Sequence, residues 1–414
     1  MFRIWIYLRI SSFFSGLFLN NQVKKKDKLI KNFISQQSNK KFTALFSQCR
    51  VAFYFILKFL KNRSNKSEII FCAYNLPEMV NVAENLNLKV KFCDLNYQSG
   101  FIDIGQLKKT ISNKTIAIVL TNMFNSYNDS KEIKRIAKIN KITLIEDNAI
   151  YFDNYKNERG FRFYSGNLGD YTIYSFNIMK NISSFYGGAA STNNLDFIKY
   201  YNKEEIKLNN FFYIPLIKQV IIYFILKLMS FNFLYKYLFI YIIKFSHKYN
   251  IKFILYLFYP SLRSIKIKFP KYYFTKISNL SISMTYYQLK DKNRRKKFFN
   301  LRKIKHKYYL NKLSKIKDRK FNLIKIVDKN YQNFLDFPIL VQDKKNLNKY
   351  LLDKGIEIRF KHYYNCEKMF KIKQKCVNAE RYEKELICLP AHPKISFQYI
   401  DFIVKNIEIY YSKL

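Results

Sequence analysis

Glycine, proline, tryptophan and acidic residues are all scarce in this sequence of 414 residues. With only 9 glycines and 7 prolines, the chain is neither collagen-like nor a Gly/Pro-rich low-complexity sequence. Apolar residues make up 49%, which excludes a disordered chain, and the length allows one large domain and a smaller one. The six cysteines form no CxxC pair, and the four histidines lack metal-ligand spacing. We therefore expect no metal site, and we expect reduced cysteines in a cytoplasmic protein.

Acidic residues are too few to balance the basic ones. The chain has 29 aspartates and glutamates and 74 lysines and arginines, which gives a formal net charge of +45. Such a charge is typical of proteins that bind nucleic acid or anionic membranes. Lys, Asn, Ile, Phe and Tyr are all abundant, however, and an AT-rich genome encodes this composition without any selected basic surface. We favour that codon bias. Residues 94–170 carry 11 basic and 9 acidic residues, whereas residues 201–330 carry 30 and 5, so any anionic surface is expected to bind there.

Long uninterrupted apolar runs are also missing. Residues 1–19 are apolar but contain Arg3 and Arg9 and lack a small-residue cleavage site, so we expect an amphipathic helix rather than a signal peptide. Residues 211–259 are the most apolar segment, and lysines divide them into runs well short of the roughly 20 residues that span a bilayer. This segment is either a helical insertion packed on the core, which we favour, or a peripheral membrane contact.

The basic run at residues 290–307 is a candidate for binding phosphate backbones. Its Leu, Ile, Phe and Tyr residues recur at helical spacing. This pattern favours a helix with one packed face and one solvated face, so we expect no specific nucleic-acid partner.

Short β-rich runs alternate with helical segments between about residues 67 and 147. The runs SEIIFCA, KVKFCDL, TIAIVLT and KITLIED are separated by PEMVNVAENLN, DIGQLKKTI and SKEIKRIAKIN. This alternation predicts an α/β fold with a mostly parallel, doubly wound sheet. Ligands of such sheets bind outside the carboxyl ends of the strands, and Asp147 lies at such an end.

The composition along the chain predicts five regions. They are an N-terminal helical extension (1–41), a large domain (42–200), an apolar helical insertion (201–270), connecting helices (271–320) and a smaller C-terminal α/β domain (321–414). We expect a long basic helix over 288–320 and a final helix near 399–411.

Five of the nine glycines fall within 29 residues, at positions 160, 166, 169, 187 and 188. A sequence poor in glycine keeps it where the backbone needs a positive φ or a close approach. The same stretch holds Ser175 and Lys180 and begins just after Asp147. An enzyme that uses pyridoxal phosphate (PLP) needs a lysine amine for the cofactor aldehyde, a carboxylate beside the pyridine nitrogen and a hydroxyl near the phosphate. Each residue alone is weak evidence, but the ordered set predicts such an enzyme.

At these residues, the segment IEDNAIYFDNYKNERGFRFYSGNLGDYTIYSFNIMKNISSFYGGAASTNN resembles the DegT family of PLP-dependent sugar aminotransferases. SQCRVAFYFILKFL is similar to the family's phosphate loop and its helix, and KGIEIRF and ICLPAHPKIS are similar to its small-domain motifs. The resemblance covers roughly residues 42–200 and 272–411. It implies the type I aminotransferase fold, with a large PLP-binding domain, a smaller C-terminal domain and PLP as cofactor.

The resemblance assigns roles residue by residue. Lys180 matches the lysine that bonds to PLP, and Asp147 matches the partner of the pyridinium nitrogen. Ser175 matches the phosphate-binding serine, and Arg50 and Val51 match the two positions whose backbone N–H groups bind the phosphate. Lysine at this position also implies transamination, because a relative with histidine there dehydrates sugars.

Five positions depart from the family pattern. They are Cys49 for the loop glycine, Leu76 for the residue that stacks on the cofactor ring, Ile150 for a Gln or His near cofactor and substrate, Tyr186 for a Glu, and Phe274 for the Asn that reaches the partner subunit's cofactor. Tyr74 is a candidate substitute for the stacking residue. These departures bear on substrate identity and on activity.

The sequence thus predicts a cytoplasmic PLP-dependent aminotransferase. The resemblance implies a nucleotide-linked keto-sugar as substrate, glutamate as amino donor, a role in surface polysaccharide (lipopolysaccharide) biosynthesis and a homodimer with active sites at the interface. Two alternatives remain open: a catalytically silent PLP-fold protein that binds a sugar nucleotide or a partner, and a basic protein that binds a membrane surface.

Overall fold

The computed structural model describes most of the chain. The described residues are 2–19, 21–123, 127–152, 155–158, 161–258, 270–316, 320–326 and 335–413. Gly160 of the glycine cluster and Tyr259 at the end of the apolar segment lie outside these ranges.

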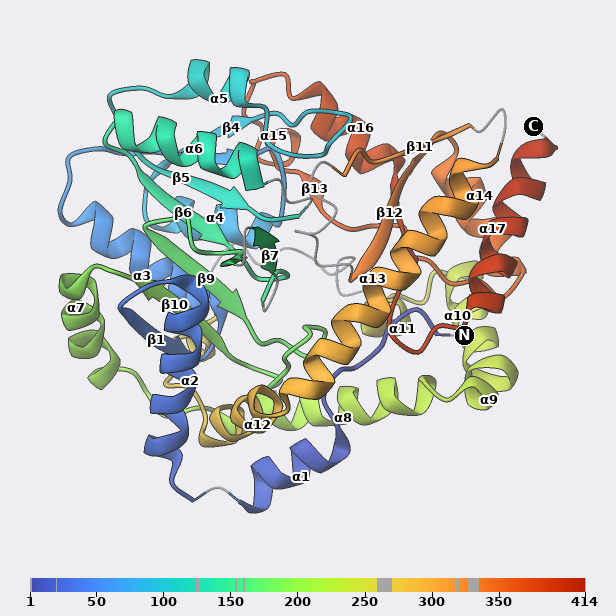
Figure 1. The fold of residues 1–414 in the computed structure, drawn as a ribbon, viewed down its shortest axis with the longest axis horizontal. Helices are drawn as coiled ribbons and strands as arrows, with labels where there is room; N and C mark the ends of the chain where they lie inside the picture. The colour runs from blue at the N-terminus through green and yellow to red at the C-terminus, as the bar shows by residue number, and fades with distance from the viewer. Residues whose placement is uncertain are drawn as a thin grey trace.

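A seven-stranded sheet forms the centre of the large domain (Figure 1). In order across the sheet, its strands are β1 (Phe42–Phe46), β10 (Gly188–Thr192), β9 (Tyr171–Ser175), β6 (Thr143–Asp147), β5 (Thr115–Thr121), β2 (Glu68–Cys72) and β4 (Lys89–Cys93). All neighbours from β9 to β4 are parallel, and β10 is antiparallel to both β1 and β9. The predicted mostly parallel sheet is confirmed, and the four predicted strands are β2, β4, β5 and β6.

Helices cover both faces of this sheet. They are α3 (Cys49–Lys61), α4 (Pro77–Asn85), α5 (Ile104–Thr110), α6 (Tyr127–Ile139) and α7 (Leu195–Ile206). From β2 the chain crosses through α4 to β4, then returns in the opposite direction through α5 to β5. Because such crossovers are right-handed, α4 lies on one face and α5 and α6 on the other (Figure 1). The strand order therefore reverses between β2 and β5, where ligands of doubly wound sheets bind.

The smaller C-terminal domain contains an antiparallel three-stranded sheet. Its strands are β11 (Phe321–Leu323), β12 (Asp336–Val341) and β14 (Leu386–Pro390), and its helices are α14 (Lys344–Asp353), α16 (Val377–Glu385) and α17 (Phe397–Ser412). The predicted final helix is α17. A short strand, β13 (Tyr364–Asn365), precedes α15 (Cys366–Met369) and pairs with β3 (Tyr74–Asn75) of the large domain. This pairing joins the two domains. The large domain also has a hairpin of β7 (Tyr155–Glu158) and β8 (Phe161–Tyr164).

Two helices connect the domains where one long basic helix was predicted. They are α12 (Asn279–Lys290) and α13 (Lys292–Ser314), preceded by the short turn η3 (Lys271–Tyr273). The predicted continuous helix is wrong at its start because Asp291 leaves the helical conformation, at ψ 69°, and its side chain accepts a hydrogen bond from the Arg294 N–H at 3.2 Å. Aspartate at such a position caps the following helix. One face of α13 is buried, as predicted, but within the run 290–307 its buried residues are Arg302, Lys305 and His306 rather than the apolar ones, and Ile304 is 50% exposed.

The N-terminal residues form a helix only in part. Residues 10–18 form α1 (Ile10–Phe18) and α2 (Val23–Ser38) follows, but the described residues before α1 are not helical. Phe2, Ile4, Ile6 and Leu8 are all buried. The predicted helix over 1–19 is therefore wrong for its first half, because this segment is surrounded by apolar side chains from several elements and has no solvated side.

The apolar insertion folds as a series of helices, as predicted. They are α8 (Tyr213–Met229), α9 (Asn232–Leu234), the π-helical turn η1 (Tyr235–Phe239), α10 (Ile240–Lys248) and α11 (Lys252–Phe258). Their buried side chains share one apolar cluster with residues 2–8 and with Met284 of α12. Within the described residues no single helix is long and apolar enough to cross a bilayer. Taken together, α8 and the helical stretch Asn232–Lys248 have the length and apolar composition of a membrane-spanning segment, but the chain bends by 84° at the break between them.

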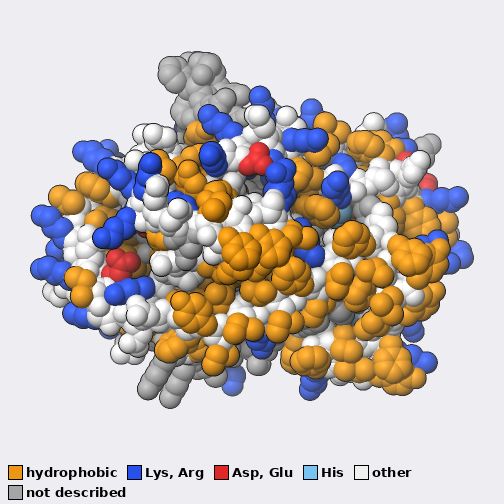
Figure 2. Space-filling view, turned by 90° about the horizontal axis from the view of Figure 1, so that it is seen from below, with side chains coloured by type: hydrophobic (Ala, Val, Ile, Leu, Met, Phe, Trp, Pro, Cys, Tyr) orange, Lys and Arg blue, Asp and Glu red, His pale blue; other side chains and the backbone are white. Residues whose placement is uncertain are grey.

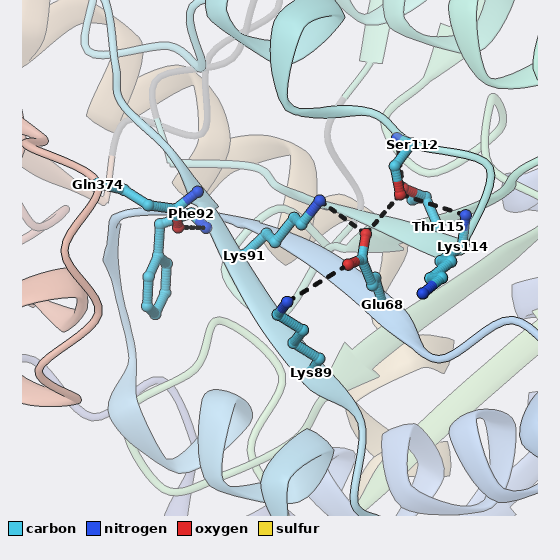
Figure 3. A network of polar contacts seen from close by, with 8 residues as sticks. All are labelled: Glu68, Lys89, Lys91, Phe92, Ser112, Lys114, Thr115 and Gln374. Carbon is cyan, nitrogen blue, oxygen red and sulfur yellow. Dashed lines mark hydrogen bonds and ion pairs between the residues drawn. The ribbon is translucent and has the colours of Figure 1, made fainter.

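A buried glutamate joins the amino-terminal ends of three strands (Figure 3). Glu68 at the start of β2 is only 5% exposed and forms an ion pair with the Lys91 ammonium of β4 at 2.7 Å. It also accepts a hydrogen bond from the Ser112 hydroxyl just before β5. Burial alone would raise the pKa of Glu68, but the hydrogen bonds from Lys91 and Ser112 outweigh it and the pKa is lowered. This cluster links three neighbouring strands at the end of the sheet that is opposite to Asp147.

Candidate active site

A cavity of about 420 Å³ opens beside the carboxyl ends of β6 and β9. Asp147, Ser175 and Lys180 all contribute to its wall, and Cys49 and Arg50 contribute from the start of α3. Four of the five predicted site residues thus line one cavity. Val51 does not line it and is buried instead. The parallel strands explain the meeting, because β6 and β9 are neighbours and their carboxyl ends lie at the same edge of the sheet.

Asp147 is the last residue of β6 and is 7% exposed. One carboxylate oxygen accepts a hydrogen bond from the Ala149 N–H at 3.0 Å. Burial raises the pKa of Asp147, and the Ala149 N–H and the charge of Lys180 oppose this shift. Among the described residues no lysine or arginine forms an ion pair with it, so its carboxylate can hold a cation supplied by a ligand.

Lys180 lies in the turn between β9 and β10, where its N–H donates to the Asn177 carbonyl at 2.9 Å. Burial lowers the pKa of its amine to about 8, against the opposing charges of Asp147 and Cys49. No carboxylate in the described part of the chain forms an ion pair with this amine. A fraction of the amine is therefore neutral near neutral pH and is a nucleophile.

The start of α3 offers backbone N–H groups to the cavity. Gln48 makes no side-chain cap, and its carbonyl accepts hydrogen bonds from the N–H groups of Val51 at 3.1 Å and Ala52 at 3.2 Å. The N–H groups of Cys49 and Arg50 have no acceptor within the described residues. Of the predicted pair, Arg50 and Val51, the Val51 N–H already donates within the first turn of the helix, so the geometry offers the N–H groups of Cys49 and Arg50, and the phosphate role of Val51 stays a prediction. A helix N-terminus of this kind binds phosphate.

The glycine pair before β10 allows this helix to approach the sheet. A Cβ atom at Gly188 would lie 2.4 Å from the backbone nitrogen of Cys49, and one at Gly187 would lie 2.7 Å from the Ser184 hydroxyl. Gly188 also pairs with Ser175 across the β10–β9 ladder. A larger residue at position 188 would push the N-terminus of α3 away from the Ser175 hydroxyl.

Four of the five departures from the family pattern line the cavity. Leu76, Ile150 and Tyr186 do so, as does Cys49 at the start of α3. The proposed substitute Tyr74 does not, because it is buried in the core and its hydroxyl accepts a hydrogen bond from the Tyr363 N–H at 3.1 Å. Phe274 packs its ring 4.8 Å from that of Tyr54 on the large domain.

The small domain contributes a polar group that the sequence did not reveal as part of the site. The Arg359 guanidinium lines the cavity, is 2.8 Å from an Asp336 carboxylate oxygen and is 3.1 Å from the His362 Nδ1. Burial, and then the charge of Arg359, lower the pKa of His362 well below its usual range, so the ring is neutral. Arg359 is the last residue but one of the motif KGIEIRF, and only that motif marked this position in the sequence.

The N-terminal segment closes another side of the cavity. Arg3, Ile4, Trp5 and Tyr7 all line it. The Arg3 guanidinium is 3.4 Å from the Glu357 carboxylate of the small domain, and both side chains are buried. Nothing in the sequence of residues 1–9 predicted this position.

The residues present fit pyridoxal phosphate. A buried lysine amine and a buried carboxylate share the cavity, and neither has an ion-pair partner among the described residues. Ser175 makes no side-chain hydrogen bond within the described part of the chain, and it lies beside the N-terminus of α3 through Gly188. The lysine amine suits the cofactor's aldehyde, and the carboxylate suits its ring nitrogen. Ser175 and the N-terminus of α3 suit its phosphate. Where the structure describes the chain, no three His, Cys, Asp or Glu side chains are close enough to share a metal ion.

The similarity to solved structures extends over the whole chain and shows the fold. PseC of Helicobacter pylori, an aminotransferase involved in the biosynthesis of pseudoaminic acid, is 16% identical, with a TM-score of 0.70 and coverage of 100% of this chain and 99% of that one. Spr1654 of Streptococcus pneumoniae, described as a sugar aminotransferase in its PLP form, is also 16% identical, with a TM-score of 0.67 and coverage of 100% and 99%.

Similarity in sequence is more local. The uncharacterized protein MJ1066 of Methanocaldococcus jannaschii is 28% identical over 171 residues. This alignment covers 41% of the chain and only 42% of the relative's length.

A family match covers most of the chain and omits the apolar insertion. Residues 19–206 and 272–408 match the DegT/DnrJ/EryC1/StrS aminotransferase family. The two matched segments contain the sheet, Asp147, Ser175, Lys180 and the small-domain residue Arg359. The chain belongs to the DegT/DnrJ/EryC1/StrS aminotransferase family.

Proposed function

We propose that this protein is a PLP-dependent aminotransferase that transfers the amino group of glutamate to a nucleotide-linked keto-sugar for a surface polysaccharide. The observation that carries the proposal is the meeting of Lys180, which is half-buried, and Asp147, which is buried, in one cavity at the carboxyl ends of β6 and β9. Membership of the family and the sugar aminotransferases among the structural neighbours support the reaction type.

The residues of the site divide the work of transamination. When bound, PLP supplies an aldehyde that bonds to amines and a ring that accepts electrons from the adjacent carbon. Lys180 would hold the cofactor through its Nζ amine and, once released, would move a proton between the substrate carbon that bears nitrogen and the carbon of the former aldehyde group, which a pKa of about 8 permits near neutral pH. Asp147 keeps the ring nitrogen protonated through its negative charge. Ser175 and the N–H groups of Cys49 and Arg50 hold the phosphate.

Cationic groups in the cavity support an anionic substrate. Arg50, Arg359 and Lys361 all line it. Guanidinium and ammonium groups bind phosphates and carboxylates, which a nucleoside diphosphate and glutamate both carry. The Arg50 guanidinium lies 5.0 Å from the centroid of the Tyr273 ring, which restrains its position.

The first experiment follows the visible absorbance of protein-bound PLP. The purified protein is expected to show this absorbance, and Lys180→Ala is expected to lose it together with the activity. Lys199→Ala, on the exposed side of α7, is the matched control and should keep both. A wild-type protein that stays colourless with added PLP would overturn the proposal. A panel of nucleotide-linked keto-sugars with glutamate then identifies the substrate.

A catalytically silent PLP-fold protein is the second candidate, and one observation favours it. Leu76 and Ile150 line the cavity where the family carries a stacking residue and a Gln or His. Binding of PLP without turnover of any keto-sugar in the panel would favour this candidate.

We also propose a cytoplasmic homodimer that lies at the inner face of the membrane. The family resemblance supports the dimer, and the exposed apolar side chains of the insertion support the location. Sedimentation at twice the 50.1 kDa of one chain is the expected result for the dimer.

A further inference from the structure

Large apolar side chains are exposed on one face of the molecule. Figure 2 shows the side on which α1 and α8 lie in Figure 1, and hydrophobic side chains cover much of its middle and right. The most exposed are Phe18 at 74%, Ile214 at 82%, Phe233 at 71% and Phe253 at 83%. We call this surface the apolar face. It consists of Ile10, Phe14, Leu17, Phe18 and Leu19 around α1, and Tyr213, Ile214, Ile217, Ile221, Phe224, Leu228, Phe231, Phe233, Tyr237, Leu238, Tyr241, Phe245, Tyr249 and Phe253 on α8–α11.

The apolar face is not the packed side of these helices. A different set of residues, including Leu216, Tyr223 and Leu226 of α8, is buried against the N-terminal segment. The ring of Phe13 in α1 lies 5.9 Å from that of Tyr223 and 5.8 Å from that of Phe224, so α1 and α8 are neighbours. A helix that packs on one side in a soluble protein normally exposes a polar side. Contiguous exposed apolar patches mark interaction sites.

Charge indicates what the apolar face contacts. The sequence contains no aspartate or glutamate between Glu205 and Asp291. Lys218, Lys236, Lys248 and Lys252 are exposed among the apolar side chains. The ammonium of Lys236 lies 4.9 Å from the ring centroid of Tyr237, and that of Lys248 lies 5.3 Å from that of Tyr249. Lysine and tyrosine beside apolar side chains are typical of residues at the boundary between lipid and water.

A second copy of the chain is a poorer occupant. A two-fold contact would place the same acid-free, lysine-bearing surface on both sides of the interface, and like charges across an interface repel each other. Anionic lipid headgroups, in contrast, attract the lysines, while the acyl chains accept the phenylalanine and isoleucine side chains.

The position of α8 fits a helix that lies along a membrane and does not fit one that crosses it. Gln219 and Ile222 of α8 line the active-site cavity, whereas Ile217, Ile221 and Phe224 of the same helix belong to the apolar face. Because one side of α8 is a wall of the cavity, the helix cannot leave the protein to span a bilayer. One helix, with a diameter of about 10 Å, separates the cavity from the apolar face.

We propose that α1 and α8–α11 form a monotopic surface that binds anionic phospholipid bilayers and places the active site next to the lipid headgroups. This surface rests on and sharpens the proposed location at the inner face of the membrane, but it does not depend on the reaction. The binding therefore persists even in a protein that fails to transaminate.

The test is co-flotation of the purified, PLP-loaded protein with vesicles. Vesicles of phosphatidylcholine mixed with phosphatidylglycerol are expected to carry the protein, and vesicles of phosphatidylcholine alone, or high salt, are expected to carry much less. The triple variant Ile214→Ser, Phe233→Ser, Phe253→Ser should bind at least about tenfold more weakly, because each side chain loses its burial in lipid. Unchanged visible absorbance of PLP in this variant shows that the fold and the active site are intact.

The matched control changes exposed apolar residues elsewhere. Ile139→Ser with Val377→Ser alters side chains that are 64% and 61% exposed on α6 and α16, far from the apolar face in Figure 1, and should bind like the wild type. Equal flotation of the triple variant and the wild type would overturn the proposal. So would equal binding to both kinds of vesicle, or a wild-type oligomer that dissociates in the triple variant without any vesicle binding.

Discussion

The chemistry of this protein depends on two buried groups whose pKa values influence each other. Burial of the Lys180 amine lowers its pKa to about 8, and the charge of Asp147 opposes that shift. Asp147 is buried too, which raises its pKa, and Lys180 opposes that shift in turn. Perturbed groups that meet in a cavity are typical of catalytic sites. The two groups can be tested separately, because the visible absorbance of bound PLP reports on Lys180 and the rate of turnover reports on Asp147.

The rate at which the apoprotein takes up PLP should depend on pH through Lys180. Only the neutral amine attacks the aldehyde, and its fraction rises about tenfold per pH unit below the pKa. The rate should therefore rise with pH and level off above about 8. Stopped-flow absorbance measures it. A rate that continues to rise to the pKa of an ordinary lysine, 10.5, would contradict the predicted environment.

Asp147→Asn should separate cofactor attachment from catalysis. The variant keeps the shape of the side chain but removes its charge, so the ring nitrogen loses its partner and turnover should fall by at least about a hundredfold. Because the charge of Asp147 raises the pKa of Lys180, the pH at which PLP uptake levels off should also move below about 8. Asp103→Asn, at the cap of α5, is the control. A purely structural role for Asp147 would leave the pH midpoint unchanged.

At the scale of elements, the site depends on how closely α3 approaches β10. Gly188 permits this contact because a Cβ atom there would lie 2.4 Å from the Cys49 nitrogen. The N–H groups of the helix then lie at the cavity beside Ser175. A single methyl group at this position therefore affects both packing and phosphate binding.

Gly188→Ala should destabilise the protein by about 1–3 kcal/mol and weaken PLP binding, because the backbone must shift to admit the methyl group. Urea unfolding and PLP titration measure the two effects. Gly105→Ala is the control, since its Cβ would meet only the Asp103 side chain, at 3.3 Å, and alanine favours the helix α5. Equal behaviour of the two variants would show that the helix and strand tolerate separation.

The Glu68 cluster at the other end of the sheet should make stability depend on pH (Figure 3). The pKa of Glu68 is lowered in the folded state, so its contribution is complete above its ordinary pKa of 4.5 and is lost as pH falls through the lower folded value. Glu68→Gln should lose about 1–3 kcal/mol at neutral pH, from hydrogen bonds to a charged group. The difference from the wild type should shrink in acid. Glu408→Gln, at an exposed position of α17 that forms no ion pair within the described residues, should behave as the wild type does at both pH values.

At the scale of the whole molecule, the N-terminal segment joins regions that are distant in the sequence. It lies in the apolar cluster of the insertion, lines the cavity through Arg3 and Trp5, and meets Glu357 of the small domain. The His392 Nε2 is also 3.0 Å from the Phe2 carbonyl. Residues 2–9 thus couple the insertion, the active site and the small domain.

Arg3→Ala should destabilise the protein far more than Arg9→Ala. Removing Arg3 leaves the Glu357 carboxylate buried without its partner, which costs about 3–5 kcal/mol. Arg9 pairs with Asp291 at 3.1 Å, but both side chains are exposed to solvent, so its loss should cost less than about 1 kcal/mol. Chemical unfolding compares the two variants. Similar losses would mean that the N-terminal segment is not part of the folded core.

The sequence predicted what depends on local pattern and on strand order. Alternating apolar runs predicted β2, β4, β5 and β6 and placed Asp147 at a carboxyl end, where ligands of such sheets bind. Ser175 and Lys180 were predicted to join Asp147 from the residue set that PLP chemistry needs and from the family resemblance, and all three line the cavity. Arg50 was also found at the cavity. Val51 does not line the cavity and its N–H donates to the Gln48 carbonyl, which the sequence could not show because the hydrogen bonds of the first turn of α3 decide which N–H groups face a ligand.

What the sequence determined by itself was the set of strands β2, β4, β5 and β6, their mostly parallel doubly wound sheet and the place of Asp147 at a carboxyl end, since these follow from periodicity and from the alternation of strands and helices. Tertiary structure alone decided the rest. Arg359 and the N-terminal segment line the cavity because the small domain and the insertion fold back on the large domain, which is a matter of long-range packing. The same packing determined which apolar residues of the insertion are buried and which are exposed. In a helix that is apolar on all sides, the sequence has no periodic pattern that indicates which side is buried.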